Sequence, residues 1–275
     1  MTTPTRTRRT LRARLLAFIQ DATGRLTAAW RILATAQERL LAALTAVRPG
    51  RGSGAAIRAA TAVFQRQLAA FDRAVTAFAE RWASVDLPLA YREGAFTMLD
   101  NADRPTSRWT WTRRHQEAIT TLAAQYYVDL ISRLGEALRR ARAFLRAALD
   151  AARGRGFDTD QLRADHPLDR VIYAGDHRHP VHAWASAALS WQTVSTANAG
   201  AARTALDDLG IQFLEVRDGP DCGWATHDDS DRADRTVRTV ADALAHPLAH
   251  PNCQREFLPR IDLTGRTNIN SGAPL

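Results

Sequence analysis

The sequence lacks lysine, has only two cysteines and contains no long apolar run, and the last two features each exclude a class of protein. All 37 basic side chains are therefore arginine, and they outnumber the 29 acidic side chains to give a net charge of +8. Two cysteines are too few for a disulfide-rich secreted scaffold. No segment approaches the roughly 18 consecutive apolar residues of a membrane-spanning helix. We therefore expect no membrane association, and a protein kept in a cytoplasm or packed into a particle there.

Familiar catalytic motifs are also missing, which favours a protein that is not an enzyme. The sequence contains no phosphate-binding loop, dinucleotide-binding glycine pattern, nucleophile elbow or metalloprotease helix. Apolar residues make up 45% of the chain, which is enough to build a folded core. Because arginine holds phosphate and carboxylate groups with two hydrogen bonds, the excess positive charge predicts an anionic partner, nucleic acid first and an acidic protein surface second.

Long helices are predicted in the first half of the chain. Apolar residues recur at three- and four-residue steps, with alanine between them, over residues 11–47, 55–84 and 112–153. A Pro- and Gly-rich stretch at 49–54 separates the first two helices, which should therefore form an antiparallel hairpin. A shorter helix is expected to open at Pro88.

The pattern changes after Phe157, where proline, glycine, histidine and aspartate become common. Residues 181–209 are predicted to be helical, in two pieces. Alternating apolar residues at 211–216 predict the best strand of the chain. Residues 237–244 are expected to hold a strand end and a helix, and 257–259 to form a partner strand.

These expectations define a mainly α fold, in which a long N-terminal helical hairpin or bundle precedes a small α+β C-terminal domain. The expected organisation is an elongated helical domain with a basic N-terminal tail over residues 1–155, the α+β domain over 156–265, and a loose tail over 266–275.

Two cysteines and two histidines in the C-terminal part are the candidate metal ligands. Cys222 is followed by His227, and His250 closely precedes Cys253. Four such side chains in two pairs match the composition of a tetrahedral zinc site, although the spacing is not that of a standard zinc finger. Two alternatives stay open at this point: a Cys222–Cys253 disulfide in an oxidising setting, and two buried cysteines beside surface histidines without any metal.

Five arginines near the N-terminus are candidate nucleic-acid contacts. They lie within nine residues and have no acidic residue between them: Arg6, Arg8, Arg9, Arg12 and Arg14. Such a cluster suits contact with phosphates of double-stranded DNA, and a mobile basic tail is the alternative interpretation. No motif that reads bases is recognisable, so any binding should be independent of DNA sequence.

Two C-terminal segments resemble the signature of a known family. Residues 216–224 are Val-Arg-Asp-Gly-Pro-Asp-Cys-Gly-Trp, and residues 250–255 are His-Pro-Asn-Cys-Gln-Arg. Together they resemble the C-terminal signature of the Mu F-like minor capsid, or head morphogenesis, proteins of tailed phages, in the form found in actinobacterial phages and prophages. Residues 91–95, Tyr-Arg-Glu-Gly-Ala, resemble the Tyr-x-x-Gly-x element of the family's helical region.

The chain departs from the family pattern at two cysteine positions. Ala225 replaces the second cysteine of the Cys-x2-Cys element, and Arg255 replaces the last cysteine of the family ending. A four-cysteine metal site is therefore excluded, and any metal would have to recruit His227 and His250.

The resemblance implies a structural role. Members of this family are present in few copies, associate with the portal vertex inside the capsid, contact DNA, and act in head assembly and in DNA packaging and delivery. The expected partners are the phage portal protein, the capsid and double-stranded DNA, with self-association left open. The expected location is the interior of the phage head, after synthesis in the host bacterial cytoplasm.

Two further functions compete with this interpretation. One is a metal-dependent nuclease or toxin-like enzyme that uses the C-terminal His/Asp/Cys cluster, with His227, Asp228, Asp229 and His250 as its reactive groups. The other is a plain, non-specific nucleic-acid-binding protein.

Overall fold

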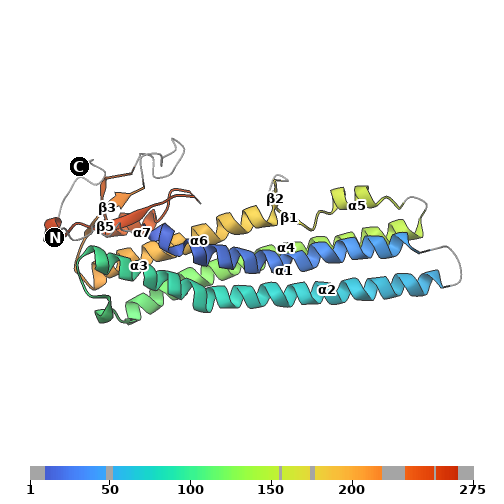
Figure 1. Cartoon of the computed structure of the whole chain (residues 1–275), viewed down its shortest axis with the longest axis horizontal. Helices are drawn as coiled ribbons and strands as arrows, with labels where there is room; N and C mark the ends of the chain where they lie inside the picture. The colour runs from blue at the N-terminus through green and yellow to red at the C-terminus, as the bar shows by residue number, and fades with distance from the viewer. Residues whose placement is uncertain are drawn as a thin grey trace, which may run out of the picture. The chain divides into compact units, whose positions relative to one another are not determined.

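The computed structural model describes residues 10–47, 52–154, 157–173, 177–218, 233–250 and 252–265. Its helices and strands follow the chain in the order shown in Figure 1: α1 (Leu11–Thr45), α2 (Ser53–Arg81), a π-helical turn (Trp82–Asp86), α3 (Leu87–Asn101), a 3-10 turn (Thr106–Arg108), α4 (Arg113–Arg153), α5 (Thr159–Asp165), β1 (Arg170–Ile172), β2 (Arg178–Pro180), α6 (Val181–Asp207), β3 (Phe213–Arg217), β4 (Val237–Thr239), α7 (Val240–Ala245), β5 (Glu256–Pro259) and a 3-10 turn (Ile261–Leu263). The expected mainly helical fold with a small C-terminal sheet is confirmed. Within these ranges, no helix has both the length and the apolar composition that crossing a lipid bilayer requires.

The expectation that residues 181–209 form two helical pieces is wrong, because α6 is a single helix. The glycine within this helix, Gly200, and Gly94 of α3 have a packing role. A side-chain carbon added at Gly200 would overlap the carbonyl oxygen of Tyr91 in α3, and one added at Gly94 would overlap that of Ala197 in α6. The glycines therefore let the backbones of α3 and α6 touch while the helix continues.

The chain divides into two compact units, each built from separate segments. The first unit contains residues 1–21, 82–125 and 187–275, and the second contains residues 22–81 and 126–186. Helices α1, α4 and α6 contribute residues to both units. Each unit combines segments from both sides of residue 155. The two compact units therefore differ from the three consecutive segments expected from composition, and the boundaries of those segments stay predictions.

The core of the second unit is formed by apolar faces of long helices. Trp30 of α1 packs edge-on against Phe71 of α2, with ring centroids 5.2 Å apart, as expected if these helices form a hairpin. Phe64 of α2 packs against Phe144 of α4 at 5.7 Å. Each of these four rings is buried. The heptad-like spacing of Phe64 and Phe71 places both on one face of α2, which explains why the helix is amphipathic.

The first unit contains a three-stranded antiparallel sheet in the order β4-β3-β5. Strand β3 is central, with Leu214 opposite both Arg238 of β4 and Pro259 of β5. Alternate residues of β3 enter an apolar cluster with α3 and α6, through Met98 and Ala202 among others. Helix α7 lies beside this sheet (Figure 1) and contacts β3 and β4.

Candidate functional site

The two signature segments meet at one edge of the β3–β5 ladder. Strand β3 ends at Arg217, which lies opposite Glu256, the first residue of β5. The next residue on β3's side is Asp218, and the residue before β5 is Arg255, so the register of an antiparallel pair brings these two side chains together. The strands thus join positions that are 37 residues apart in the sequence.

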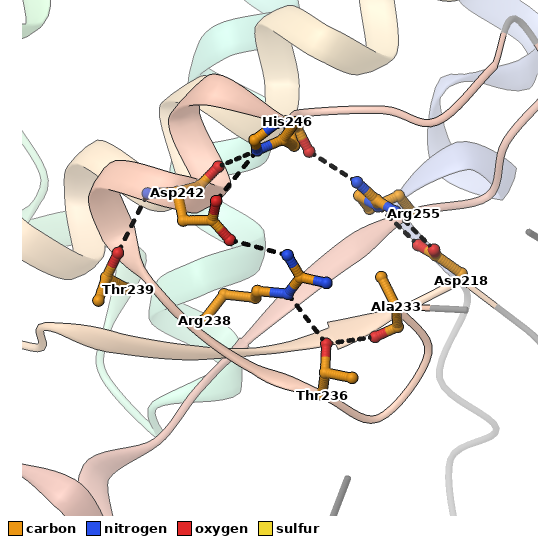
Figure 2. Close-up of polar contacts among 8 residues, drawn as sticks. All are labelled: Asp218, Ala233, Thr236, Arg238, Thr239, Asp242, His246 and Arg255. Carbon is orange, nitrogen blue, oxygen red and sulfur yellow. Dashed lines mark hydrogen bonds and ion pairs between the residues drawn. The ribbon is translucent and has the colours of Figure 1, made fainter. Parts of the chain in front are cut away.

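Asp218 and Arg255 form a buried, bidentate ion pair (Figure 2). The Nε of Arg255 donates to Oδ1 of Asp218 at 2.8 Å, and its Nη2 donates to Oδ2 at 2.7 Å. The two side chains are 2% and 1% exposed. Two parallel charge-assisted hydrogen bonds fix both groups in one geometry, which is the arrangement that best offsets the cost of removing charges from water.

Further hydrogen bonds complete this buried site. The Nη1 of Arg255 donates to the carbonyl of His246 at 2.8 Å, so every nitrogen of the guanidinium has an acceptor. The backbone N–H of Asp218 donates to Oδ1 of Asp234 at 2.9 Å. The side-chain amide of Asn198, in α6, donates to the carbonyls of Arg255 at 2.9 Å and of Pro247 at 2.8 Å. The pair therefore ties β3, β5, α6 and the segment after α7 together.

A second set of polar contacts lies along α7, next to the buried ion pair. Arg238 donates to Oδ2 of Asp242 at 3.1 Å, and Oδ1 of Asp242 lies 3.1 Å from Nδ1 of His246 (Figure 2). The hydroxyl of Thr239 accepts the N–H of Asp242 and so caps the helix. Because His246 also supplies the carbonyl that Arg255 uses, the cap and the buried pair form one connected network.

The start of α1 also contacts this corner. The N–H of Leu11 donates to a carboxylate oxygen of Glu256 at 3.0 Å, which satisfies one of the donors that a helix leaves unpaired at its N-terminus. The Nη1 of Arg12 donates to the carbonyl of Cys253 at 2.9 Å. Burial lowers the pKa of the Arg12 guanidinium from its usual value, and the nearby Cys253 opposes that shift.

The structure describes only half of the candidate zinc ligands. Cys222 and His227 lie outside the described residues, as do Asp228 and Asp229 of the enzyme hypothesis. Cys253 is 1% exposed and belongs to an apolar cluster; its other members are Leu11, Leu15, Ile19, Val194, Ala197 and Leu248. His250 is half-buried, and its carbonyl accepts the N–H of Cys253 at 2.8 Å.

Among the residues placed by the structure, no group of three or more His, Cys, Asp or Glu side chains is arranged to hold a metal ion. The four-residue zinc set and the alternative disulfide therefore stay predictions. The chemistry that the described residues do provide at this position is the ion pair. Arg255 provides it, and its guanidinium links residues 216–218 to residues 250–255.

Of the five candidate DNA-contacting arginines, the structure describes two. Arg6, Arg8 and Arg9 lie outside the described residues. Besides the contact of Arg12 with Cys253, the guanidinium of Arg14 lies 3.3 Å from Glu93 and 3.5 Å from Asp100, both in α3. A DNA phosphate at Arg14 would have to compete with these two carboxylates.

The first unit also contains a buried polar network that was not expected from the sequence. The hydroxyl of Tyr91 lies 2.9 Å from Nδ1 of His115, and Nε2 of His115 lies 3.1 Å from Asp208. Desolvation by burial raises the pKa of Tyr91, the charges of Asp207 and Asp208 add to the rise, and Arg203 opposes it. Tyr91 therefore keeps its proton, and its hydroxyl and the carboxylate of Asp208 contact different nitrogens of the His115 ring.

The network of Tyr91, His115 and Asp208 has a structural role in the fold, because Tyr91 and His115 are both 0% exposed and offer no access to a substrate. It also explains the Tyr-x-x-Gly element of α3. Tyr91 anchors the start of α4 through His115, and Gly94 allows the contact with α6 one turn later. No spacing in the sequence links Tyr91, His115 and Asp208, so only the tertiary fold reveals them.

Comparison with known proteins adds no relative: no family model, curated protein or solved structure matches the chain. The fold and the site by themselves define a mainly helical protein whose small C-terminal sheet is closed by a buried ion pair.

Proposed function

We propose that this chain is a minor head protein of a tailed phage, of the Mu F-like kind, that associates with the portal vertex inside the capsid. In this role it contacts the packaged double-stranded DNA and acts in head assembly and in DNA packaging and delivery, without catalysing a reaction. The observation that carries the proposal is the buried pair between Asp218 and Arg255.

The pair supports the proposal because it connects the two segments on which the family resemblance rests. Asp218 belongs to the first segment and Arg255 ends the second, and their side chains share one site although they are 37 positions apart. A chance match of short motifs would have no reason to bring both motifs to the same buried corner. Segments that build one local structure together are, in contrast, what a family signature is expected to contain, although Arg255 itself stands where the family pattern has a cysteine.

The buried polar groups of the described chain also favour a structural role over catalysis. The guanidinium of Arg255 and the carboxylate of Asp218 use their hydrogen-bonding capacity on each other and on the surrounding backbone. Tyr91 and His115 are similarly occupied. A catalytic acid or base needs access to its substrate, and these groups are enclosed.

Co-purification with the portal protein of the same genome tests the proposal. The full chain and an affinity-tagged portal protein are produced together, captured on the tag and separated by size-exclusion chromatography in a high-salt buffer that removes DNA. We expect the two proteins to elute as one complex. A chain that elutes alone, while it remains folded by circular dichroism, would contradict the proposed association with the portal.

A further inference from the structure

The whole net charge of the protein belongs to the second compact unit. By sequence, that unit has 19 arginines and 11 acidic residues, a net charge of +8, whereas the first unit has 18 of each and is neutral. The five N-terminal arginines are included in the neutral unit. An anion-binding surface is therefore expected in the second unit and not at the N-terminus.

Most of the first unit's arginines that the structure describes are paired with carboxylates of the same unit. Arg114 contacts Asp207 at 2.9 Å, and Arg260 contacts Asp262 at 2.7 Å. Arg255 is buried against Asp218. These guanidinium groups already have an anionic partner within the fold, so an external anion gains little by binding them.

Three arginines of α4 in the second unit differ in this respect. Arg139, Arg142 and Arg146 are exposed, and they are the exposed positions of α4 between residues 139 and 149. None of the three guanidinium groups has a hydrogen bond or ion pair with a residue that the structure describes; the ion pairs seen along this part of α4 involve Arg133, Arg140 and Arg153. At 100° per residue they fall within about 60° of one another around the helix, so they form one stripe.

The charge of the helix terminus does not explain this stripe. Cations are stabilised by the helix dipole only within the last turn. Arg153, the last residue of α4, is placed to have that role and lies 3.5 Å from Asp150. Arg146 is two turns earlier, and like charges three and four residues apart destabilise a helix. The stripe is therefore unfavourable for the isolated helix, and an external anion would relieve the repulsion.

We propose that Arg139, Arg142 and Arg146 bind the phosphate backbone of double-stranded DNA without reading its bases. The stripe spans about 10.5 Å along the helix axis, and one DNA strand presents about three phosphates over that length. An acidic protein is the less favoured partner, because protein interfaces have an apolar or aromatic centre and the exposed positions of this stripe are all arginine. The choice of DNA rests on the proposed function, whereas the position of the site rests on these three side chains.

Salt-dependent DNA binding by two triple variants tests this site. In one variant Arg139, Arg142 and Arg146 are changed to glutamine. The matched control changes three exposed arginines of α2 in the same unit for which the structure shows no ion pair: Arg58, Arg66 and Arg73. Both variants lose three charges from exposed helix positions, and glutamine preserves helix propensity. The probe is a linear double-stranded DNA fragment of mixed sequence, and its affinity is measured from 50 to 200 mM salt.

Each phosphate contact contributes about 0.9 to the slope of log K against log salt concentration. Loss of three contacts should reduce the slope by about 2.7. Between 50 and 200 mM salt, the affinity of the parent should therefore fall about 40-fold more than the affinity of the α4 variant. The α2 variant should keep the parent slope. Equal reductions in both variants would mean diffuse attraction and would overturn the proposal.

A second outcome would also overturn the inference. If the α4 variant keeps the parent's salt slope for DNA but no longer co-purifies with the portal protein, the stripe is a protein-docking surface. The reverse result separates the two claims. If the slope falls as expected but the parent chain does not bind the portal protein, the DNA site stands and the proposed function fails. Circular dichroism of both variants verifies that each remains folded.

Discussion

Breaking the Asp218–Arg255 pair should be among the most destabilising single changes in the C-terminal part. The change we consider is Arg255→Ala, which removes three donors at once. It leaves the carboxylate of Asp218 buried without its partner and the carbonyl of His246 without a donor. The free-energy cost comes mainly from the charge that is left behind, since burying an unpaired ion is far more costly than burying a paired one.

The expected magnitude follows from the burial of both partners. Removal of one member of a buried ion pair costs about 3–5 kcal/mol, which is a large part of the roughly 5–15 kcal/mol by which folded proteins are stable. For a urea dependence of about 3 kcal/mol per molar, at the upper end of the range for small proteins, the unfolding midpoint should fall by at least about 1 M.

Equilibrium urea denaturation, followed by tryptophan fluorescence, measures this change. The matched control is Arg113→Ala, which breaks an equally short 2.7 Å contact with Glu117 between side chains that are 91% and 62% exposed. An exposed pair of this kind contributes less than about 1 kcal/mol, so the control should hardly shift the midpoint. If Arg255→Ala costs no more than Arg113→Ala, the ion pair does not hold the two segments together, and our reasoning about the site is refuted.

A double replacement extends the test. When Arg255→Met is combined with Asp218→Leu, no buried charge remains, and stability should recover to within about 1–2 kcal/mol of the parent chain. A double variant that is as unstable as Arg255→Ala would show that the surrounding backbone, rather than the unpaired charge, determines the cost.

Two further predictions concern the contacts of α3. Gly94→Ala should lower the free energy of unfolding by about 3 kcal/mol, because the added carbon overlaps a carbonyl of α6. Gly24→Ala, which adds a carbon in open space on α1, should raise it by about 1 kcal/mol. Calorimetry of both variants measures this difference. The raised pKa of Tyr91 means that the folded state keeps a proton that the unfolded state loses above pH ~10, so stability should fall with rising pH there by up to about 1.4 kcal/mol per pH unit. Denaturation of Tyr91→Phe above that pH should show a weaker fall than the parent, and Tyr127→Phe controls for the loss of a tyrosine hydroxyl; a Tyr91→Phe profile identical to that of the parent would contradict the assignment.

Local features of the sequence were sufficient to predict most of the secondary structure. The long helices follow from apolar residues at three- and four-residue steps, and the expected ranges 11–47 and 112–153 agree with α1 and α4 to within two residues. Strand β3 follows from the alternation at 211–216, although it begins two residues later, at Phe213. In each case, the information lies within a few residues of the element itself.

The site was harder to predict because its partners are distant in sequence. Cys222 and Cys253 were chosen for their ligand chemistry, whereas Asp218 and Arg255 owe their contact to the register of β3 and β5, which no local pattern encodes. In the sequence, Arg255 stands out only because it replaces a cysteine of the family pattern. Similarly, Arg14 belonged to a presumed basic tail, but the structure pairs it with two carboxylates of α3.

The location of the protein in purified phage heads tests the central claim most directly. Heads are treated with protease to remove external protein, and the chain is then quantified by mass spectrometry relative to the portal and major capsid proteins. We predict that protease-treated heads contain the chain in few copies, and that heads assembled without the portal protein contain none. Absence from protease-treated heads, or an amount that does not depend on the portal protein, would contradict the proposed function.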